Sequence, residues 1–151
     1  MKYFEAFGEG GFHSAFMTTY AFGSLAFEDI PFPKLRGAGC RNITVLADRG
    51  MVNQAFSEFG PPRFAGTSYH LVKVDAPGAF HPKITMLIGE TKGRLIVGSA
   101  NLTALGLGGN KEQLASISYS TDAPENAKFF IGALSYLRRY VAQDDQWFPV
   151  S

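Results

Sequence analysis

Short apolar and β-branched runs recur through the first half of this chain, each bounded by glycine, proline or polar residues. Three of these runs are typical of strands: 14–22 (SAFMTTYAF), 42–47 (NITVLA) and 69–74 (YHLVKV). The middle run is almost wholly apolar, which indicates a strand buried on both faces. The first half therefore predicts several short strands that belong to a common sheet.

Segments of helical character lie between these runs. Residues 24–36 are apolar with a helical tendency, but Pro31 and Pro33 must interrupt or end any helix there, because proline lacks an N–H and clashes with the preceding turn. Residues 51–59 look helical and are stopped by the Gly-Pro-Pro that follows. Strands and helices that alternate in this way indicate a sheet with helices on its faces.

The second half holds two strand-like runs close together, 84–89 (ITMLIG) and 93–98 (GRLIVG), joined by the short polar turn ETKG. This arrangement predicts a β-hairpin. A further strand is expected at 113–119 and the longest helix at 124–141. The whole pattern predicts an α/β fold with a mixed central sheet flanked by helices.

Polar side chains gather at one end of the predicted hairpin. His81 and Lys83 stand two apart at the start of the first run, and Ser99 and Asn101 stand two apart after Gly98 ends the second. Residues two apart on a strand point to the same face, so a paired hairpin would bring an imidazole, an ammonium, a hydroxyl and a carboxamide into one pocket. That set offers a nucleophile and hydrogen-bond donors but no carboxylate, which suits a phosphate diester.

Composition adds limits to this picture. The chain has 151 residues, the size of one domain, and 46% of them are hydrophobic, enough for a core. A net charge of +1 argues against a protein that coats nucleic acid. No run of about 18 apolar residues occurs, so no membrane span is expected. A single cysteine, Cys40, excludes an internal disulfide and fits a cytoplasmic location.

The combination of HxK with GSxN resembles the signature of the phospholipase D superfamily. In this chain the first element is His81 and Lys83, and the second is Gly98, Ser99 and Asn101. The fold that the resemblance implies is one half of a two-lobed phospholipase D-like structure, which agrees with the mixed sheet expected from the hydrophobic pattern.

The resemblance extends from the hairpin to a trailing N-x-E element, which Asn110, Lys111 and Glu112 match. One position departs from the family pattern. Family members often carry an aspartate five residues after the lysine, where this chain has Ile88. Its absence weakens a phospholipase interpretation more than a general phosphodiesterase interpretation.

The resemblance also implies roles for individual residues. His81 would attack phosphorus and form a phosphohistidine that water then releases, with no metal or cofactor. Lys83 would bind a non-bridging oxygen as a point charge, and Asn101 would donate its amide to the same phosphoryl group. The remaining roles are supporting ones: hydrogen bonding for Ser99, close backbone approach for Gly98 and orientation of a catalytic histidine for Glu112.

The implied reaction uses two histidines, one as nucleophile and one as proton donor. The chain has three, and only His81 carries the motif; His13 and His70 are expected to be structural. The second motif should therefore come from another copy of the chain in a homodimer, or from a region beyond Ser151 in a longer parent protein. Residues 1–143 are accordingly expected to form the phospholipase D-like domain, and 144–151 a tail or the start of a linker.

Several other polar residues allow either a functional or an ordinary interpretation. Glu28 is expected to lie on the surface. One cysteine and scattered histidines give no zinc-ligand spacing. Basic residues near the motif would form either a local basic rim or a set of solvated strand-edge side chains; they are Lys73, Lys83, Lys92, Arg94 and Lys111.

Three functions are compatible with these features. The leading hypothesis is a metal-independent phosphodiesterase that cleaves nucleic acid, because a small cytosolic chain with one motif resembles the nuclease branch of the superfamily. The second is a phospholipid hydrolase or transferase, which would need an apolar rim that docks on a membrane. The third is a phosphate-binding module that keeps the pocket but has no catalytic partner histidine.

Overall fold

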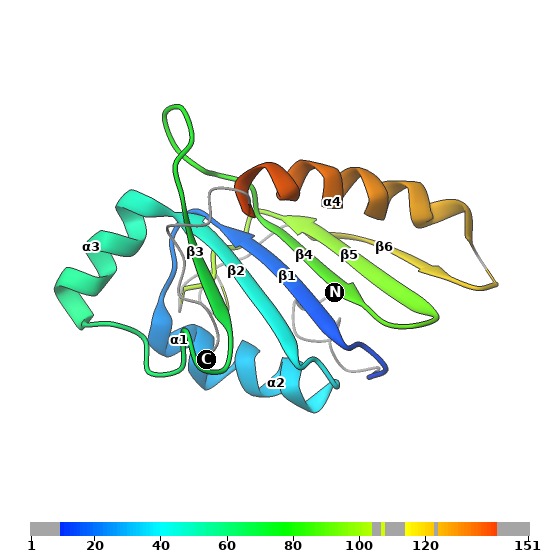
Figure 1. The fold of residues 1–151 in the computed structure, drawn as a ribbon, viewed down its shortest axis with the longest axis horizontal. Helices are drawn as coiled ribbons and strands as arrows, with labels where there is room; N and C mark the ends of the chain where they lie inside the picture. Colours follow the sequence, from blue (N-terminus) through cyan, green and yellow to red (C-terminus); the bar gives the residue numbers. More distant parts are fainter. Residues whose placement is uncertain (1–9, 104–106, 108–113, 123, 142–151) are drawn as a thin grey trace.

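A mixed six-stranded sheet with the strand order β3-β2-β1-β4-β5-β6 forms the centre of the molecule (Figure 1). The computed structural model describes residues 10–103, 107, 114–122 and 124–141. The strands are β1 (Ser14–Thr19), β2 (Asn42–Asp48), β3 (His70–Val74), β4 (Ile84–Ile88), β5 (Lys92–Gly98) and β6 (Leu114–Ser120).

Strand direction changes in the middle of this sheet. β1, β2 and β3 run parallel to one another, whereas β4 is antiparallel to β1, β5 to β4 and β6 to β5. The carboxyl ends of β1, β2, β3 and β5 therefore lie on the same edge as the amino end of β4. We call this the motif edge, and its strand ends are Thr19, Asp48, Val74, Gly98 and Ile84.

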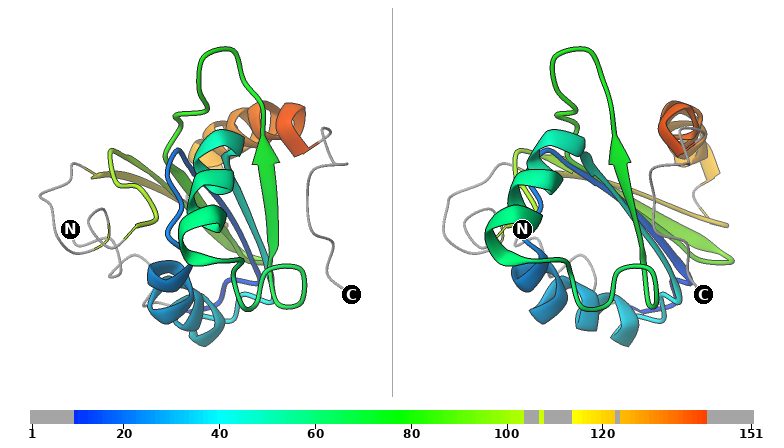
Figure 2. Two further views of the ribbon diagram at one scale, coloured as in Figure 1. Left: turned by 90° about the vertical axis from the view of Figure 1, so that its left-hand side faces the viewer. Right: turned by 60° about the vertical axis from the view of Figure 1, so that its left-hand side comes forward.

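Helices cover both faces of the sheet (Figure 2). α1 (Ser24–Asp29), α2 (Pro31–Gly37) and α3 (Arg49–Phe59) lie on one face, and α4 (Ala127–Val141) lies on the other after a short 3-10 turn, η3 (Pro124–Asn126). This arrangement confirms the predicted α/β fold with a mixed central sheet. The predicted helix 124–141 is confirmed too, although its first turn is a 3-10 helix.

Alternate residues of the central strands pack into clusters on opposite faces of the sheet. Met17 and Ile96 belong to the larger core beneath α1, α2 and α3, whereas Met86 and Leu95 pack with Phe130 of α4 on the opposite face. Burying a side chain of this size contributes about 1.5–3 kcal/mol. Both faces of the central strands are covered, which explains their almost continuous apolar runs.

Pro31 sets the boundary between the first two helices. α1 ends at Asp29, Ile30 separates the helices, and Pro31 occupies the first turn of α2. Proline is tolerated there because first-turn N–H groups have no partner within the helix. Pro33 lies in the same turn for the same reason, so only Pro31 produces the predicted interruption.

Gly93 lets β6 and α4 approach β5 closely. A β-carbon at this position would overlap the ring of Tyr119 and would lie 2.9 Å from Cε1 of Phe130. These two aromatic rings meet edge to face with their centroids 4.6 Å apart. The glycine that opens the second predicted run is therefore required by packing rather than by the turn.

Candidate active site

The connection from β3 to β4, residues 75–83, carries His81 across the motif edge (Figure 1). It starts beside β3 and must pass the ends of β2 and β1, because those strands lie between β3 and β4. An ion pair between Arg49 Nε and Asp75 Oδ1, 2.7 Å apart, fixes its beginning. The conformation of this connection therefore decides where His81 lies.

Asp48, at the end of β2, holds the middle of the connection. Its Oδ1 accepts a hydrogen bond from the Phe80 N–H at 2.9 Å, and its Oδ2 accepts one from the Met51 N–H at 3.2 Å. The second bond is a helix N-cap, which satisfies a first-turn N–H of α3. One carboxylate thus joins the start of α3 to the residue that precedes His81.

The side chain of Phe80 provides a second anchor. It is 1% exposed and packs with Leu46 and Val72 of the sheet. Its ring also meets the ring of Tyr140 of α4 edge to face, with centroids 4.8 Å apart. The backbone directly before His81 is therefore fixed both by a hydrogen bond and by burial.

Thr18, near the end of β1, fixes the last part of the connection. Its hydroxyl donates to the Pro82 carbonyl oxygen at 2.7 Å and accepts from the Ile84 N–H at 2.9 Å. These bonds bracket Lys83. The HPK segment thus lies just before β4 rather than inside it, because Pro82 has no N–H for the sheet and a threonine hydroxyl supplies the missing contacts.

His81 and Lys83 follow from this backbone arrangement. The His81 side chain is exposed, and its ring stacks on Tyr20 with centroids 4.1 Å apart and an interplanar angle of 11°. Lys83 Nζ donates to the His81 carbonyl oxygen at 3.0 Å, which curls the side chain back over the connection. The imidazole and the ammonium are therefore held on the same short loop.

The second part of the motif meets the first through the predicted hairpin, which the β4–β5 pairing confirms. The Gly98 N–H donates to the Lys83 carbonyl oxygen at 3.2 Å, just past the last paired residues of the two strands. Ser99 follows and is exposed. A small cavity between the two parts is lined by Thr18, Lys83, Thr85, Ile96, Gly98, Ala100, Leu102 and Leu114.

Asn101 is held against the end of β1. Its Oδ1 accepts the Ala21 N–H at 3.2 Å and lies 3.2 Å from Thr19 Oγ1. In a carboxamide Oδ1 is the acceptor and the Nδ2 group is a donor, so the Ala21 N–H orients the amide with Oδ1 toward β1. The Nδ2 group consequently faces away from β1 and can donate to another group.

Five of the six predicted site residues are brought to one edge of the sheet: His81, Lys83, Gly98, Ser99 and Asn101. Their catalytic roles remain predictions. Glu112, like Asn110 and Lys111 of the trailing element, lies outside the described residues. Ile88, which replaces the family aspartate, packs beneath α4 at the far end of β4 from Lys83.

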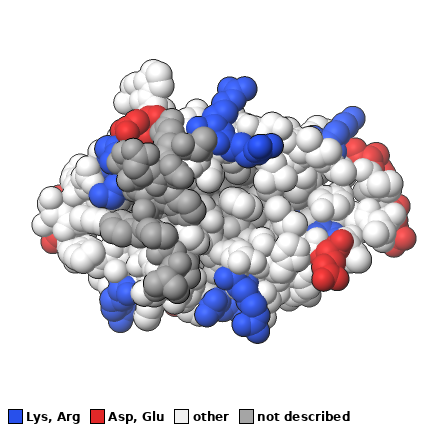
Figure 3. All heavy atoms as spheres, viewed as in Figure 1, with Lys and Arg blue, Asp and Glu red and all other residues white. Residues whose placement is uncertain are grey.

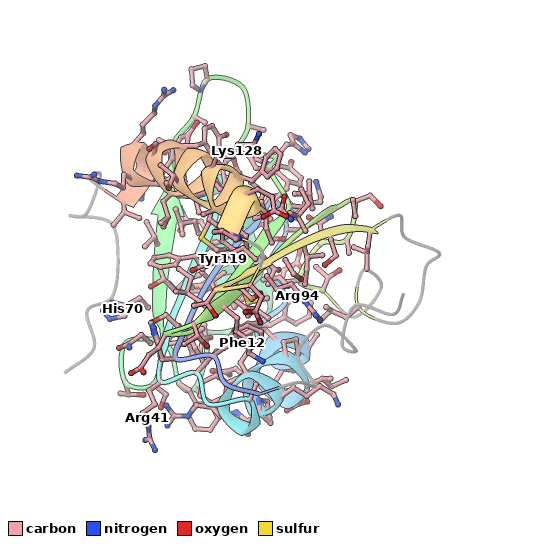
Figure 4. The ribbon with its side chains drawn as sticks, turned by 90° about the vertical axis from the view of Figure 1, so that its right-hand side faces the viewer. Phe12, Arg41, His70, Arg94, Tyr119 and Lys128 are labelled. Atoms are coloured by element: carbon pink, nitrogen blue, oxygen red, sulfur yellow. The ribbon has the colours of Figure 1, made fainter. Side chains whose placement is uncertain are left out.

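Of the two interpretations of the basic residues near the motif, the described residues do not support a basic rim around Lys83. Lys92 begins β5, roughly 20 Å along the strand from Gly98 at about 3.3 Å per residue, and its Nζ lies 4.8 Å from the centre of the Phe12 ring. Arg94 Nε contacts Ser118 Oγ at 3.2 Å. Figure 4 shows Arg94 and α4 on opposite sides of the sheet. Tyr119 lies on the α4 side, where its ring packs against Phe130.

Lys73, the remaining described basic residue of this set, also points away from Lys83. Lys73 turns to α3, where its Nζ donates to Asn53 Oδ1 at 2.9 Å and lies over the ring of Phe56. Lys111 lies outside the described residues. On the face drawn in Figure 3, the described lysines and arginines form small separate groups rather than one patch.

Glu28 is buried, so the expectation that it lies on the surface is wrong. It is 4% exposed, and its carboxylate accepts the N–H groups of Arg63 at 3.1 Å and Phe64 at 2.7 Å. The Tyr69 hydroxyl donates to it at 3.3 Å, and burial, followed by the nearby charge of Glu28, raises the pKa of that tyrosine. Its role is to hold the turn before β3.

The remaining histidines lie away from the motif edge. His13 directly precedes β1, at the opposite end from Thr19, and its exposed ring contacts Ser14 Oγ through Nδ1 at 2.7 Å. His70 begins β3 at that same opposite edge, and burial lowers the pKa of its ring. All three histidines of the chain are described, so His81 is the single imidazole at the motif edge.

Comparison with known proteins identifies this architecture. A structure of the phospholipase D family member Nuc from Salmonella typhimurium matches with a TM-score of 0.59 and 15% identity, over 91% of this chain and 84% of that one. This chain has the phospholipase D fold. NucT from Helicobacter pylori matches with a TM-score of 0.57 and 16% identity, over 97% of this chain and 87% of that one.

The amino-acid sequence alone gives no such match, since neither the protein-family models nor the curated proteins that were searched match it. The structural likeness therefore confirms the phospholipase D-like fold that the motif resemblance implies. Within that fold, the motif patterns do not reveal the residues that hold the site together, namely Asp48, Thr18, Thr19 and Tyr20. Their one sequence signal is that they are polar or aromatic residues at the ends of buried strands.

Proposed function

We propose that this protein is a metal-independent phosphodiesterase that cleaves nucleic acid through a covalent intermediate on His81. The observation that carries the proposal is the joining of both motif parts at one edge of a phospholipase D fold. The Gly98–Lys83 backbone hydrogen bond and the hydroxyls of Thr18 and Thr19 bring them together.

The first chemical step uses the groups at the motif edge. A ring nitrogen of His81 attacks phosphorus, a nitrogen–phosphorus bond forms, and the bond from phosphorus to the leaving alcohol oxygen breaks. The Lys83 ammonium and the Asn101 Nδ2 group offer positive charge and hydrogen-bond donors to the phosphoryl oxygens, whose charge rises in the transition state. This step needs a proton for the leaving oxygen.

A second imidazole is proposed as the source of that proton. It protonates the leaving oxygen, then removes a proton from the water that attacks phosphorus and breaks the nitrogen–phosphorus bond. Because His81 is the single histidine at the motif edge, we propose that a second copy of the chain supplies the other one. A two-fold axis would place the two His81 rings on opposite sides of one phosphate.

Nucleic acid is the proposed substrate. The chain carries one HxK and one GSxN element and so resembles the nuclease branch of the superfamily, which supports this choice in preference to a lipid. None of the described helices has the length and apolar character needed to cross a membrane. The small, separate groups of described basic residues on the face drawn in Figure 3 suit contacts to a few phosphates rather than the coating of a long duplex.

Cleavage of labelled DNA and RNA by EDTA-treated protein tests the proposal. We expect His81→Asn to remove cleavage and His13→Asn to keep it, since His13 is exposed at the opposite edge. Acid quenching followed by mass spectrometry should detect a phosphorylated peptide that contains His81. Cleavage that persists in His81→Asn, or that disappears in EDTA, would refute the mechanism.

The oligomeric state tests the source of the second histidine. Sedimentation of the active protein should show a dimer. Mixed dimers of wild-type and His81→Asn chains should lose activity, because every composite site would lack one imidazole. A fully active monomer would refute the proposed dimer without affecting the role of His81.

A further inference from the structure

The last residues of β1 and the residue after it contact both parts of the motif from outside it. Thr18 contacts the HPK segment, Thr19 contacts the segment that follows Gly98, and Tyr20 contacts the ring of His81. We propose that Thr18, Thr19 and Tyr20 form a positioning segment for the reacting groups. The catalytic part of this proposal rests on the proposed phosphodiesterase function.

Strand geometry explains how adjacent threonines reach different targets. Successive side chains of a strand point to opposite faces, so Thr18 and Thr19 diverge from a common backbone. Both are buried, with exposures of 3% and 0%. A buried hydroxyl requires hydrogen-bond partners, and here most of them directly adjoin the motif residues Lys83 and Asn101: they are Pro82, Ile84 and Leu102.

Thr18 controls the backbone on both sides of Lys83. Its single hydroxyl donates to one neighbour of that residue, Pro82, and accepts from the other, Ile84. Valine has nearly the same shape but neither function. With valine in this place the Pro82 carbonyl and the Ile84 N–H would lose their common partner, and Lys83 would lose the constraint on its backbone direction.

Thr19 controls the orientation of Asn101. Its hydroxyl accepts the Leu102 N–H at 3.1 Å, donates to the Ala21 carbonyl oxygen at 2.6 Å and lies 3.2 Å from Asn101 Oδ1. These bonds fix Ala21, whose N–H holds Asn101 Oδ1, and Leu102, which follows Asn101, so the amide keeps Oδ1 toward β1 and Nδ2 away from it. This is a positioning role, since the hydroxyl acts on the phosphate through the amide.

Tyr20 controls the plane of the His81 imidazole. The near-parallel stacking of the two rings restricts rotation of an otherwise exposed side chain. In-line attack on phosphorus requires a ring nitrogen that points at the reacting atom, so a fixed plane favours the productive geometry. Together the three residues orient the backbone of Lys83, the amide of Asn101 and the imidazole of His81.

Matched variants test these roles. In Thr19→Val we expect kcat to fall on the order of 100-fold, the size of effect that a small misplacement of reacting groups can produce, while KM changes little. Thr19→Ser should recover most of the activity, because serine restores the hydroxyl. Thr44→Val is the control: Thr44 lies in the neighbouring strand β2, beside Phe16 in the pairing register.

Two measurements do not depend on cleavage. The NMR signals of the His81 ring protons should move downfield in Tyr20→Leu, because the stacked ring that shields them is gone. Binding of inorganic phosphate should weaken in Thr19→Val but not in Thr44→Val. Equal kcat and phosphate affinity in these two variants, or unchanged His81 signals in Tyr20→Leu, would overturn the proposal.

Hydrogen exchange in the wild-type protein covers the case in which a valine variant fails to fold. The Ile84 and Leu102 N–H groups donate to the two threonine hydroxyls, so both should exchange slowly. Fast exchange at both positions would also overturn the proposal. Absence of His81-dependent cleavage would instead refute the phosphodiesterase function and leave the positional measurements interpretable.

Discussion

Replacing Asp48 by alanine should destabilise the protein far more than its half-buried position at a strand end suggests. The change removes the N-cap of α3, a loss of about 0.5–2 kcal/mol, and also removes the partner of the Phe80 N–H. A hydrogen bond to a charged group contributes about 1.5–3 kcal/mol. We therefore expect the free energy of unfolding to fall by about 2–4 kcal/mol.

Thermal and urea unfolding measure this effect directly. For a chain of this size, each kcal/mol corresponds to about 2–4 °C in Tm, so Asp48→Ala should lower Tm by roughly 5–15 °C. Asp48→Asn should lie between wild type and Asp48→Ala, because asparagine keeps one acceptor oxygen for one of the two N–H groups.

The matched control is Asp75→Ala, which removes the other carboxylate that holds the same connection. Asp75 pairs with Arg49 with its side chain 65% exposed, and exposed pairs contribute about 0–1 kcal/mol. An Asp48→Ala protein no less stable than Asp75→Ala would refute the idea that Asp48 anchors both α3 and the connection before His81.

Two further predictions concern packing and burial. Gly93→Ala should reduce the free energy of unfolding by about 1–3 kcal/mol in urea titrations, since a methyl group there overlaps the Tyr119 ring; unchanged stability would mean that β6 shifts without cost. Cys40 is fully buried, and burial raises the pKa of its thiol to about 11. Alkylation of this thiol at pH 8 should therefore occur only as fast as the protein unfolds. Labelling of the native protein within the dead time of mixing would contradict this.

The hairpin could be predicted from the sequence because its determinants are local. Two apolar runs flank a polar turn, and their pairing places Ile84 opposite Val97. The positions of His81, Lys83, Ser99 and Asn101 at the ends of these two runs were therefore enough to predict that they lie at a common edge. Strand-like and helical segments of the first half could be recognised for the same reason, with boundaries within about three residues.

Other features depend on strand order, which local patterns do not encode. Thr18 contacts Pro82 across 64 residues, and Thr19 contacts Asn101 across 82. Only the placement of β1 between β2 and β4 brings these groups together. Proximity in sequence was also a poor guide to proximity in space for Lys92. This residue is close to the motif in sequence but lies at the opposite end of β5 from Gly98.

Burial of Glu28 illustrates a further limit. Its immediate neighbour Asp29 is exposed, although both residues carry a carboxyl group. What distinguishes them is the turn at Arg63 and Phe64, whose N–H groups face Glu28 and compensate for the loss of water around its carboxylate. The backbone of a distant turn thus decided the environment of a side chain that appeared ordinary in the sequence.

The long sequence separation of the β1 contacts has a consequence for the order of folding events. The β4–β5 hairpin closes a short loop, whereas docking of β1 against it closes a much longer one at a larger entropic cost. An intermediate that contains the hairpin without β1 would hold every motif residue and still lack the contacts that orient them. During refolding, the proposed phosphodiesterase activity should therefore return later than the hairpin forms. It should return when the sheet is complete.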